Sequence, residues 1–217
     1  MTDRSRPDPE ELIDRLAADL TPVSFWQRPS VLLTCWLLLS VLTVLGMSLA
    51  HAAWRPGALV QLTTVPQFAL EILVAAAGIC TLIWATVQSA LPGALRPSRV
   101  VLIFVLSWAP WLALLVLGLY EPALTPSMAG KREDCYLEVM VESLPPLFIG
   151  LLMLRRLYPL RGWQTGALLG FASGMIPALL MQLSCMYLVD HAWTHHLAPV
   201  LVPALMGAAA GGRLLRR

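Results

Sequence analysis

Two of the four cysteines in this sequence lie where a thiol could react. Cys135 follows the charged stretch 131–134, and Cys185 lies at the end of a long apolar segment. Cys35 and Cys80 are inside apolar runs, where a free thiol usually packs as a small hydrophobic side chain. Cys135 and Cys185 could instead form a disulfide, bind a metal or remain two inert thiols.

Histidines and glutamates near these two cysteines extend the possible chemistry. His191 follows Cys185 by six residues, and thiolate and imidazole groups together bind soft or borderline metals such as zinc. The predicted metal ligands are therefore Cys135, Cys185 and His191. The spacing matches no recognised metal motif, and the pattern assigns no role to His195 or His196.

Three glutamates in or beside apolar segments form a predicted supporting polar cluster. They are Glu71, Glu138 and Glu142. A carboxylate within a membrane normally faces other helices or water because its burial in lipid is costly. The alternative is that these side chains lie at shallow depth and reach the membrane interface.

Enzyme motifs are missing from the sequence. It contains no Cys-x-x-Cys for thiol oxidoreduction and no His-Glu-x-x-His for a metalloprotease. Ser173, in Gly-Phe-Ala-Ser-Gly, is not in the Gly-x-Ser-Gly context of an intramembrane serine protease. We therefore predict a protein that is not an enzyme and that has no resident cofactor, apart from a transient heavy-metal or zinc ion at the cysteine pair.

Six apolar segments must position these residues. They cover approximately residues 31–52, 68–91, 100–120, 139–154, 163–188 and 196–212. Each is close to the ~20 residues that cross a bilayer, although the fourth is short. Because 58% of the 217 residues are hydrophobic and only 13% are charged, a soluble domain is excluded. The predicted fold class is all-α, a polytopic bundle of six transmembrane helices formed by residues 29–217.

The basic residues predict the orientation of this bundle. Of the 15 Lys and Arg residues, all but Arg55, Lys131 and Arg132 fall before the first segment, after the sixth, or in the second and fourth gaps. Positively charged loops are retained in the cytoplasm, so both termini should be cytoplasmic and segments 53–66, 121–138 and 189–195 should lie outside. The net charge of +2 comes from arginines that suit lipid headgroups, and no direct nucleic-acid contact is expected.

Residues 1–28 form a predicted cytoplasmic tail with a short amphipathic helix at about residues 9–20. Pro9 suits the first helical position, and aliphatic residues then recur at three- and four-residue spacing. The predicted contact residues are Leu12, Ile13, Leu16, Ala17, Asp19 and Leu20. The helix could lie on the membrane surface, but its polar face is acidic, whereas interfacial helices favour Lys and Arg. A groove on a partner protein is the other interpretation.

These features together resemble the NrsF-type membrane anti-sigma factors. The tail reads Glu11-Leu12-Ile13-x-x-Leu16-Ala17-x-Asp19-Leu20-x-Pro22-Val23, and the second segment contains Phe68-x-x-Glu71. Further along, Cys135 is followed by Glu138 and Ser143-Leu144-Pro145, and Cys185 lies near the end of the Gly-rich fifth segment. The resemblance covers essentially the whole chain.

The resemblance implies a regulator of the bacterial inner membrane. Its relatives bind an extracytoplasmic-function sigma factor at the cytoplasmic face and release it under a stress such as heavy metal or oxidant. It implies that Cys135 and Cys185 sense the stress, and the N-terminal helix is then our candidate for the sigma contact. The alternative from another class is an inner-membrane transporter of small solutes or metal ions that uses Glu71 and Glu142. The sequence leaves the sigma factor, the stimulus and the oligomeric state open.

Overall fold

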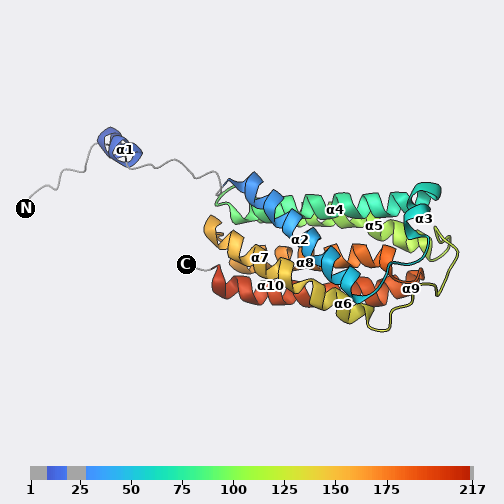
Figure 1. Cartoon of the computed structure of the whole chain (residues 1–217). Helices are drawn as coiled ribbons and strands as arrows, with labels where there is room; N and C mark the ends of the chain where they lie inside the picture. Colours follow the sequence, from blue (N-terminus) through green and yellow to red (C-terminus); the bar gives the residue numbers. More distant parts are fainter. Residues whose placement is uncertain (1–8, 19–27, 216–217) are drawn as a thin grey trace, which may run out of the picture.

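The described part of the chain, residues 9–18 and 28–215, is almost entirely helical. A computed structural model gives the elements in the order α1 (Pro9–Ala18), α2 (Pro29–His51), α3 (Ala58–Thr64), α4 (Pro66–Ala90), α5 (Pro97–Gly118), α6 (Cys135–Glu142), α7 (Leu144–Leu154), α8 (Gly162–Ser184), α9 (Val189–His191) and α10 (Leu201–Leu214). Figure 1 shows the long helices α2, α4, α5, α8 and α10 side by side in one elongated bundle. The predicted all-α class is confirmed.

Within the described residues, six helical stretches are long and apolar enough to cross a membrane. They are Pro29–His51, Pro66–Ala90, Pro97–Gly118, Cys135–Leu157, Gly162–Ser184 and Val189–Leu214. The fourth has 23 residues, so the sequence-based estimate of a short fourth segment was wrong. The fifth ends at Ser184, which places Cys185 just after the helix. The sixth stretch begins at Val189 and not near residue 196, so residues 189–195 are helical.

Prolines explain the irregularity of the fourth and sixth stretches. Pro145 and Pro146 have no N–H to donate to the carbonyls four residues earlier, and the helix breaks at Ser143 between α6 and α7. The carbonyl of Pro146 accepts a hydrogen bond from the Trp36 indole on α2 at 2.8 Å. In the sixth stretch Pro199 removes a similar bond, and residues Ala192–Leu197 adopt π-helical winding before a 3-10 turn at Ala198–Val200.

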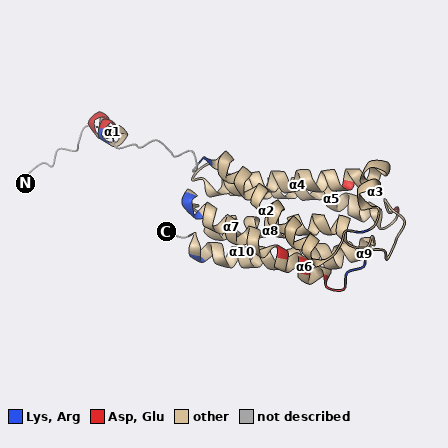
Figure 2. Cartoon of the chain, in the orientation of Figure 1, with Lys and Arg blue, Asp and Glu red and all other residues tan. Residues whose placement is uncertain are grey.

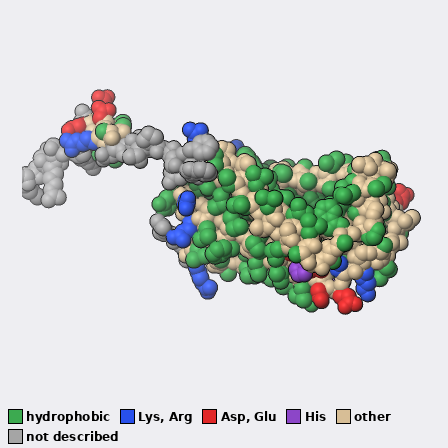
Figure 3. All heavy atoms as spheres, in the orientation of Figure 1, with side chains coloured by type: hydrophobic (Ala, Val, Ile, Leu, Met, Phe, Trp, Pro, Cys, Tyr) green, Lys and Arg blue, Asp and Glu red, His purple; other side chains and the backbone are tan. Residues whose placement is uncertain are grey.

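The two ends of the bundle differ in charge. The end that holds the starts of α2, α5 and α8, which we call the arginine-rich end, carries Arg28, Arg96, Arg99, Arg155, Arg156, Arg161 and Arg213. The opposite end, which we call the cysteine end, has Arg55, Lys131 and Arg132 together with the acidic residues of the 121–138 region (Figure 2). Between them, hydrophobic side chains cover much of the flank in Figure 3. This distribution is that of a protein with a lipid-facing belt.

Helix α8 is the centre of the bundle. In its most apolar window 72% of the residues are buried, against 22% in α2 and 28% in α5. Its glycines meet α10 at backbone distance, because a Cβ on Gly166 would overlap the Gly207 carbonyl and one on Gly170 would overlap the Pro203 carbonyl. Small residues at four-residue spacing allow such close approach in membranes. Helices α8 and α10 therefore form one tightly joined pair.

Replacing Gly166 by alanine is expected to separate this pair and lower the free energy of unfolding by about 1–3 kcal/mol, the usual cost of overpacking. Thermal unfolding of the detergent-solubilised protein measures the change. Gly46→Ala in α2 is the matched control, because a Cβ there meets no heavy atom within 4 Å. Equal unfolding temperatures for the two variants would contradict the close approach.

The N-terminal helix α1 exposes the aliphatic face that its spacing predicted. None of its residues is buried, and Leu12, Ile13 and Leu16 are 46%, 62% and 61% exposed. On the polar side Arg15 pairs with Glu11. Asp19 and Leu20, the last two predicted contact residues, lie outside the described residues. The described helix is thus a short amphipathic segment with an uncovered apolar face.

Candidate functional site

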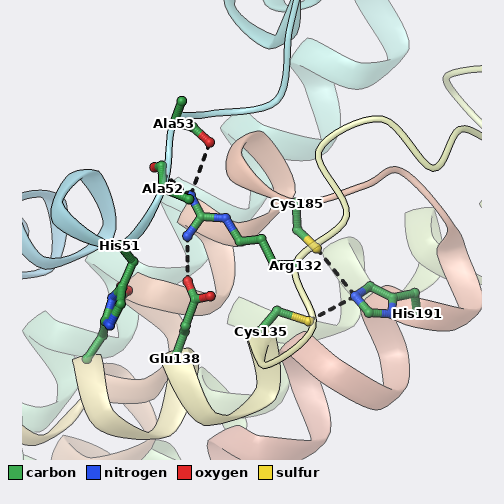
Figure 4. A network of polar contacts seen from close by, with 9 residues as sticks. His51, Ala52, Ala53, Arg132, Cys135, Glu138, Cys185 and His191 are labelled. Carbon is green, nitrogen blue, oxygen red and sulfur yellow. Dashed lines mark hydrogen bonds and ion pairs between the residues drawn. The ribbon is translucent and has the colours of Figure 1, made fainter.

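Four side chains from three parts of the chain meet at the cysteine end. They are Cys135 at the start of α6, Cys185 just after α8, His191 at the end of α9 and His196 in the π-helical segment. One sulfur or nitrogen atom from each lies within 4.8 Å of all the others. His191 Nε2 is 3.0 Å from Cys135 Sγ and 3.5 Å from Cys185 Sγ (Figure 4). We call these four residues the thiol-imidazole cluster.

The π-helical winding is what brings both histidines into the cluster. In a regular α-helix residues five apart point about 140° away from each other, since each residue turns the chain by about 100°. The i→i+5 winding of Ala192–Leu197 reduces this difference, so His191 and His196 face the same sulfurs with ring centroids 5.0 Å apart. His195 stacks on His191 at 4.2 Å between centroids but contributes no atom to the cluster.

The cluster is buried. Both cysteines are 0% exposed and His196 is 1% exposed, and neither ring nitrogen of His196 has a hydrogen-bond partner of normal geometry within residues 9–18 and 28–215. A hydrogen bond with the Cys135 thiol, helped by the adjacent His196 ring, lowers the pKa of Cys185 below its ordinary value. A buried thiol with a lowered pKa, beside unpartnered imidazole nitrogens, is an arrangement suited to a metal ion.

The donor set fits a four-coordinate soft or borderline metal. In tetrahedral zinc sites with sulfur and nitrogen ligands the donors lie roughly 3.3–3.8 Å apart, as bond lengths of about 2.0–2.3 Å require. The donor atoms of the cluster lie within 4.8 Å of one another, so small side-chain adjustments would bring them to these distances. The two cysteines are free thiols in this structure, so oxidation to a disulfide is the other reaction open to them.

The segment before α6 and the segment after α2 contact residues on both sides of Cys185. The backbone N–H of Ser127 donates to the Tyr187 carbonyl at 3.1 Å, and the N–H of Ala123 donates to the Tyr187 hydroxyl at 3.1 Å. Arg55 stacks on the Tyr187 ring, 5.6 Å from its centroid, and donates to the Gln182 carbonyl at 3.4 Å. Burial lowers the pKa of Arg55. These contacts fix the chain around Cys185 to the segments that contain Arg55, Ala123 and Ser127.

Arg132 joins three parts of the cysteine end. Its guanidinium pairs with Glu138 on α6 and donates to the Ala52 carbonyl at 2.9 Å, at the end of α2 (Figure 4). Its backbone N–H also helps to lower the pKa of Cys185. The pair is well shielded, with 5% of the Arg132 side chain and 13% of the Glu138 side chain exposed.

The predicted polar cluster of three glutamates is divided in the structure. Glu138 and Glu142 lie together on α6, and His51 at the end of α2 lies beside them. Glu71 is on α4, one turn from Phe68, and its charge acts on Tyr187 instead. The structure therefore brings together Cys135, Cys185 and His191 as predicted ligands, but it separates Glu71 from the other two glutamates.

Sequence reasoning missed four residues at this end. His196, His51, Arg132 and Arg55 were given no role, although all belong to the contacts above. A signal existed for His196, because Pro199 three residues later disturbs regular helix winding. No local pattern marks the other three, since their partners are distant in sequence.

Comparison with known proteins identifies the family. The sequence model of one family, described as NrsF: Negative regulator of sigma F, matches residues 16–216. The chain belongs to the NrsF family. Neither the curated proteins nor the solved structures contain a match. Membership of the NrsF family makes this chain a negative regulator of a sigma factor, which agrees with the resemblance seen in the sequence.

Proposed function

We propose that this chain is an anti-sigma factor of the bacterial inner membrane. It binds an extracytoplasmic-function sigma factor through Leu12, Ile13, Leu16, Ala17, Asp19 and Leu20, with both termini in the cytoplasm. It releases the sigma factor when Cys135 and Cys185 react with a heavy metal or an oxidant outside. The observation that carries this proposal is that the thiol-imidazole cluster and the start of α2, to which the α1 segment connects, are at opposite ends of the bundle.

The exposed face of α1 supports the sigma contact. Leu12, Ile13 and Leu16 lie on one side of a ten-residue helix. So short a helix is marginal in water, and burying its aliphatic face on a partner would stabilise it. Glu10, Glu11 and Asp14 on the other side disfavour anionic lipid as the surface that covers it.

The thiol-imidazole cluster supports the proposed release of the sigma factor by a heavy metal. To shift a regulator from 1% to 99% released, a stimulus needs about 5.5 kcal/mol of differential binding. An exposed ion pair supplies only about 0–1 kcal/mol, whereas structural zinc binds peptides with about 10–16 kcal/mol. Metal ligation by four buried donors therefore has the required magnitude.

Replacing Leu16 by glutamate is expected to weaken sigma-factor capture by about 30-fold or more, since a central aliphatic contact contributes about 2 kcal/mol or more. The tagged full chain is purified from membranes of its own bacterium, and the sigma factor recovered is quantified by mass spectrometry. Asp14→Ala on the polar face is the control and should retain capture.

The proposal is refuted if no sigma factor is recovered with the unaltered chain. Equal recovery of the sigma factor with Leu16→Glu would show that the apolar face of α1 is not the contact. The transporter alternative makes a different prediction, because ion or solute flux in vesicles should then survive the Leu16 change while no sigma factor is recovered with any variant.

A further inference from the structure

Helix α6 carries a second group of side chains of the types that bind metals, next to the thiol-imidazole cluster. Cys135, Glu138 and Glu142 are spaced i, i+3 and i+7, which places them on one face of the helix. At the far end of this face α2 terminates, and His51 Nδ1 lies 3.8 Å from Glu142 Oε1. One donor atom from each of His51, Glu138 and Glu142 lies within 4.8 Å of the other two.

Glu142 is the unusual member of this group. Its side chain is 0% exposed, and neither carboxylate oxygen has a hydrogen-bond partner anywhere in the described residues. A buried carboxylate without partners is strongly unfavourable unless a proton or a cation neutralises it. An unsatisfied buried group of this kind therefore indicates a missing ligand.

The nearby charges do not compensate Glu142. Glu138 adds a second negative charge, and Arg132, the arginine whose charge acts on Glu142, is already bound to Glu138 and to the Ala52 carbonyl. His51 is half exposed at the edge of the group, which leaves a route by which an ion could enter. The group thus has two carboxylates, one imidazole and one shared arginine.

We propose that His51, Glu138 and Glu142 form a second cation site, which binds a divalent first-row metal such as Mn²⁺, Fe²⁺ or Zn²⁺. Carboxylate and imidazole donors suit these ions, whereas the softer ions prefer the sulfurs of the neighbouring cluster. Three protein ligands leave coordination positions for water. The bound ion would join the end of α2 to α6 and so connect the helix that follows the N-terminal tail with the helix that carries Cys135.

Manganese tests this site separately from the thiols. The full chain carrying Cys135→Ser and Cys185→Ser, in lipid nanodiscs, is titrated with Mn²⁺ while the electron paramagnetic resonance signal of free Mn²⁺ is measured. We expect one bound Mn²⁺ per chain. Adding Glu142→Gln should weaken binding by about 100-fold, and adding His51→Gln by about 10-fold or more, as loss of groups at metal sites usually does. Glu133→Gln, at an exposed acid outside the group, is the control and should bind as the parent does.

Stability measurements show whether Glu142 is a ligand or only a structural group. Without metal, Glu142→Gln should be at least as stable as its parent, because it removes a buried charge, and Mn²⁺ should raise the unfolding temperature of the parent alone. The proposal is overturned if the parent binds no Mn²⁺ in the millimolar range, if Glu142→Gln binds equally, or if Glu142→Gln destabilises the metal-free protein. None of these results depends on the sigma factor, so they leave the proposed function standing.

Discussion

Replacing His196 by alanine is expected to weaken binding of Cd²⁺ or Zn²⁺ by at least about 100-fold, while His195→Ala changes it by no more than about twofold. The two residues are adjacent and have the same side chain, but only His196 contributes a nitrogen to the thiol-imidazole cluster. The structure therefore predicts opposite outcomes for two changes that the sequence alone does not distinguish.

The measurement uses Co²⁺ as a visible probe in the purified full chain. Bound to Cys135 and Cys185, Co²⁺ should give an absorption band from sulfur-to-metal charge transfer, and Cd²⁺ or Zn²⁺ should displace it in a competition titration. The intensity of the band reports sulfur ligation, and its metal dependence reports affinity.

Equal affinity in both histidine variants would show that the imidazole of His196 is no ligand. The cysteines would then act without it, by two-coordinate binding of a soft ion or by oxidation to a disulfide. A loss in His195→Ala as large as that in His196→Ala would point to general disruption of the π-helical segment and would also contradict the four-donor site.

Replacing Arg132 by glutamine is expected to lower the free energy of unfolding by about 3–5 kcal/mol. That is the usual cost of removing one partner of a buried ion pair, because the remaining charge stays uncompensated. Here the charge is on Glu138, and the Ala52 carbonyl also loses its donor. Chemical unfolding in mixed micelles measures the effect.

The neighbouring residue supplies the control for this prediction. Lys131 is exposed, and Lys131→Gln should change stability by no more than about 0.5 kcal/mol. Changing both partners, Arg132→Gln with Glu138→Gln, should recover at least about half of the loss, since no lone charge is then buried. A small effect of Arg132→Gln, or no recovery in the double variant, would show that the pair is not a main contact of the cysteine end.

Hydrophobic length and helix spacing were enough to predict most of the fold. Long apolar runs gave all six membrane-spanning stretches, and the three- and four-residue spacing gave α1. The predicted ends of the helices were less accurate, because individual residues determine where a helix is interrupted. Ser143 separates α6 from α7 as a result of two following prolines, and regular helix continues only to Ser184, just before Cys185.

The candidate site was predictable only in part. Cys135, Cys185 and His191 stand out by residue type and position, and the structure brings them together. His196 did not stand out because the sequence does not show the π-helical winding of Ala192–Leu197, which turns His196 toward the same sulfurs as His191. Pairing of His51 with Glu142 requires knowledge of which helices are neighbours, which no single sequence contains.

The close packing of α8 against α10 determines which helices can move when the thiol-imidazole cluster binds a ligand. Cys185 follows α8, and both histidines precede α10, so three of the four donors belong to a block whose glycine backbones already touch. Cys135 is the one donor of the four outside this pair, on α6, and α6 is divided from α7 at Ser143. We expect contraction of the donors around an ion to move α6 relative to the α8–α10 pair, and this movement would reach the end of α2, which Arg132 joins to α6.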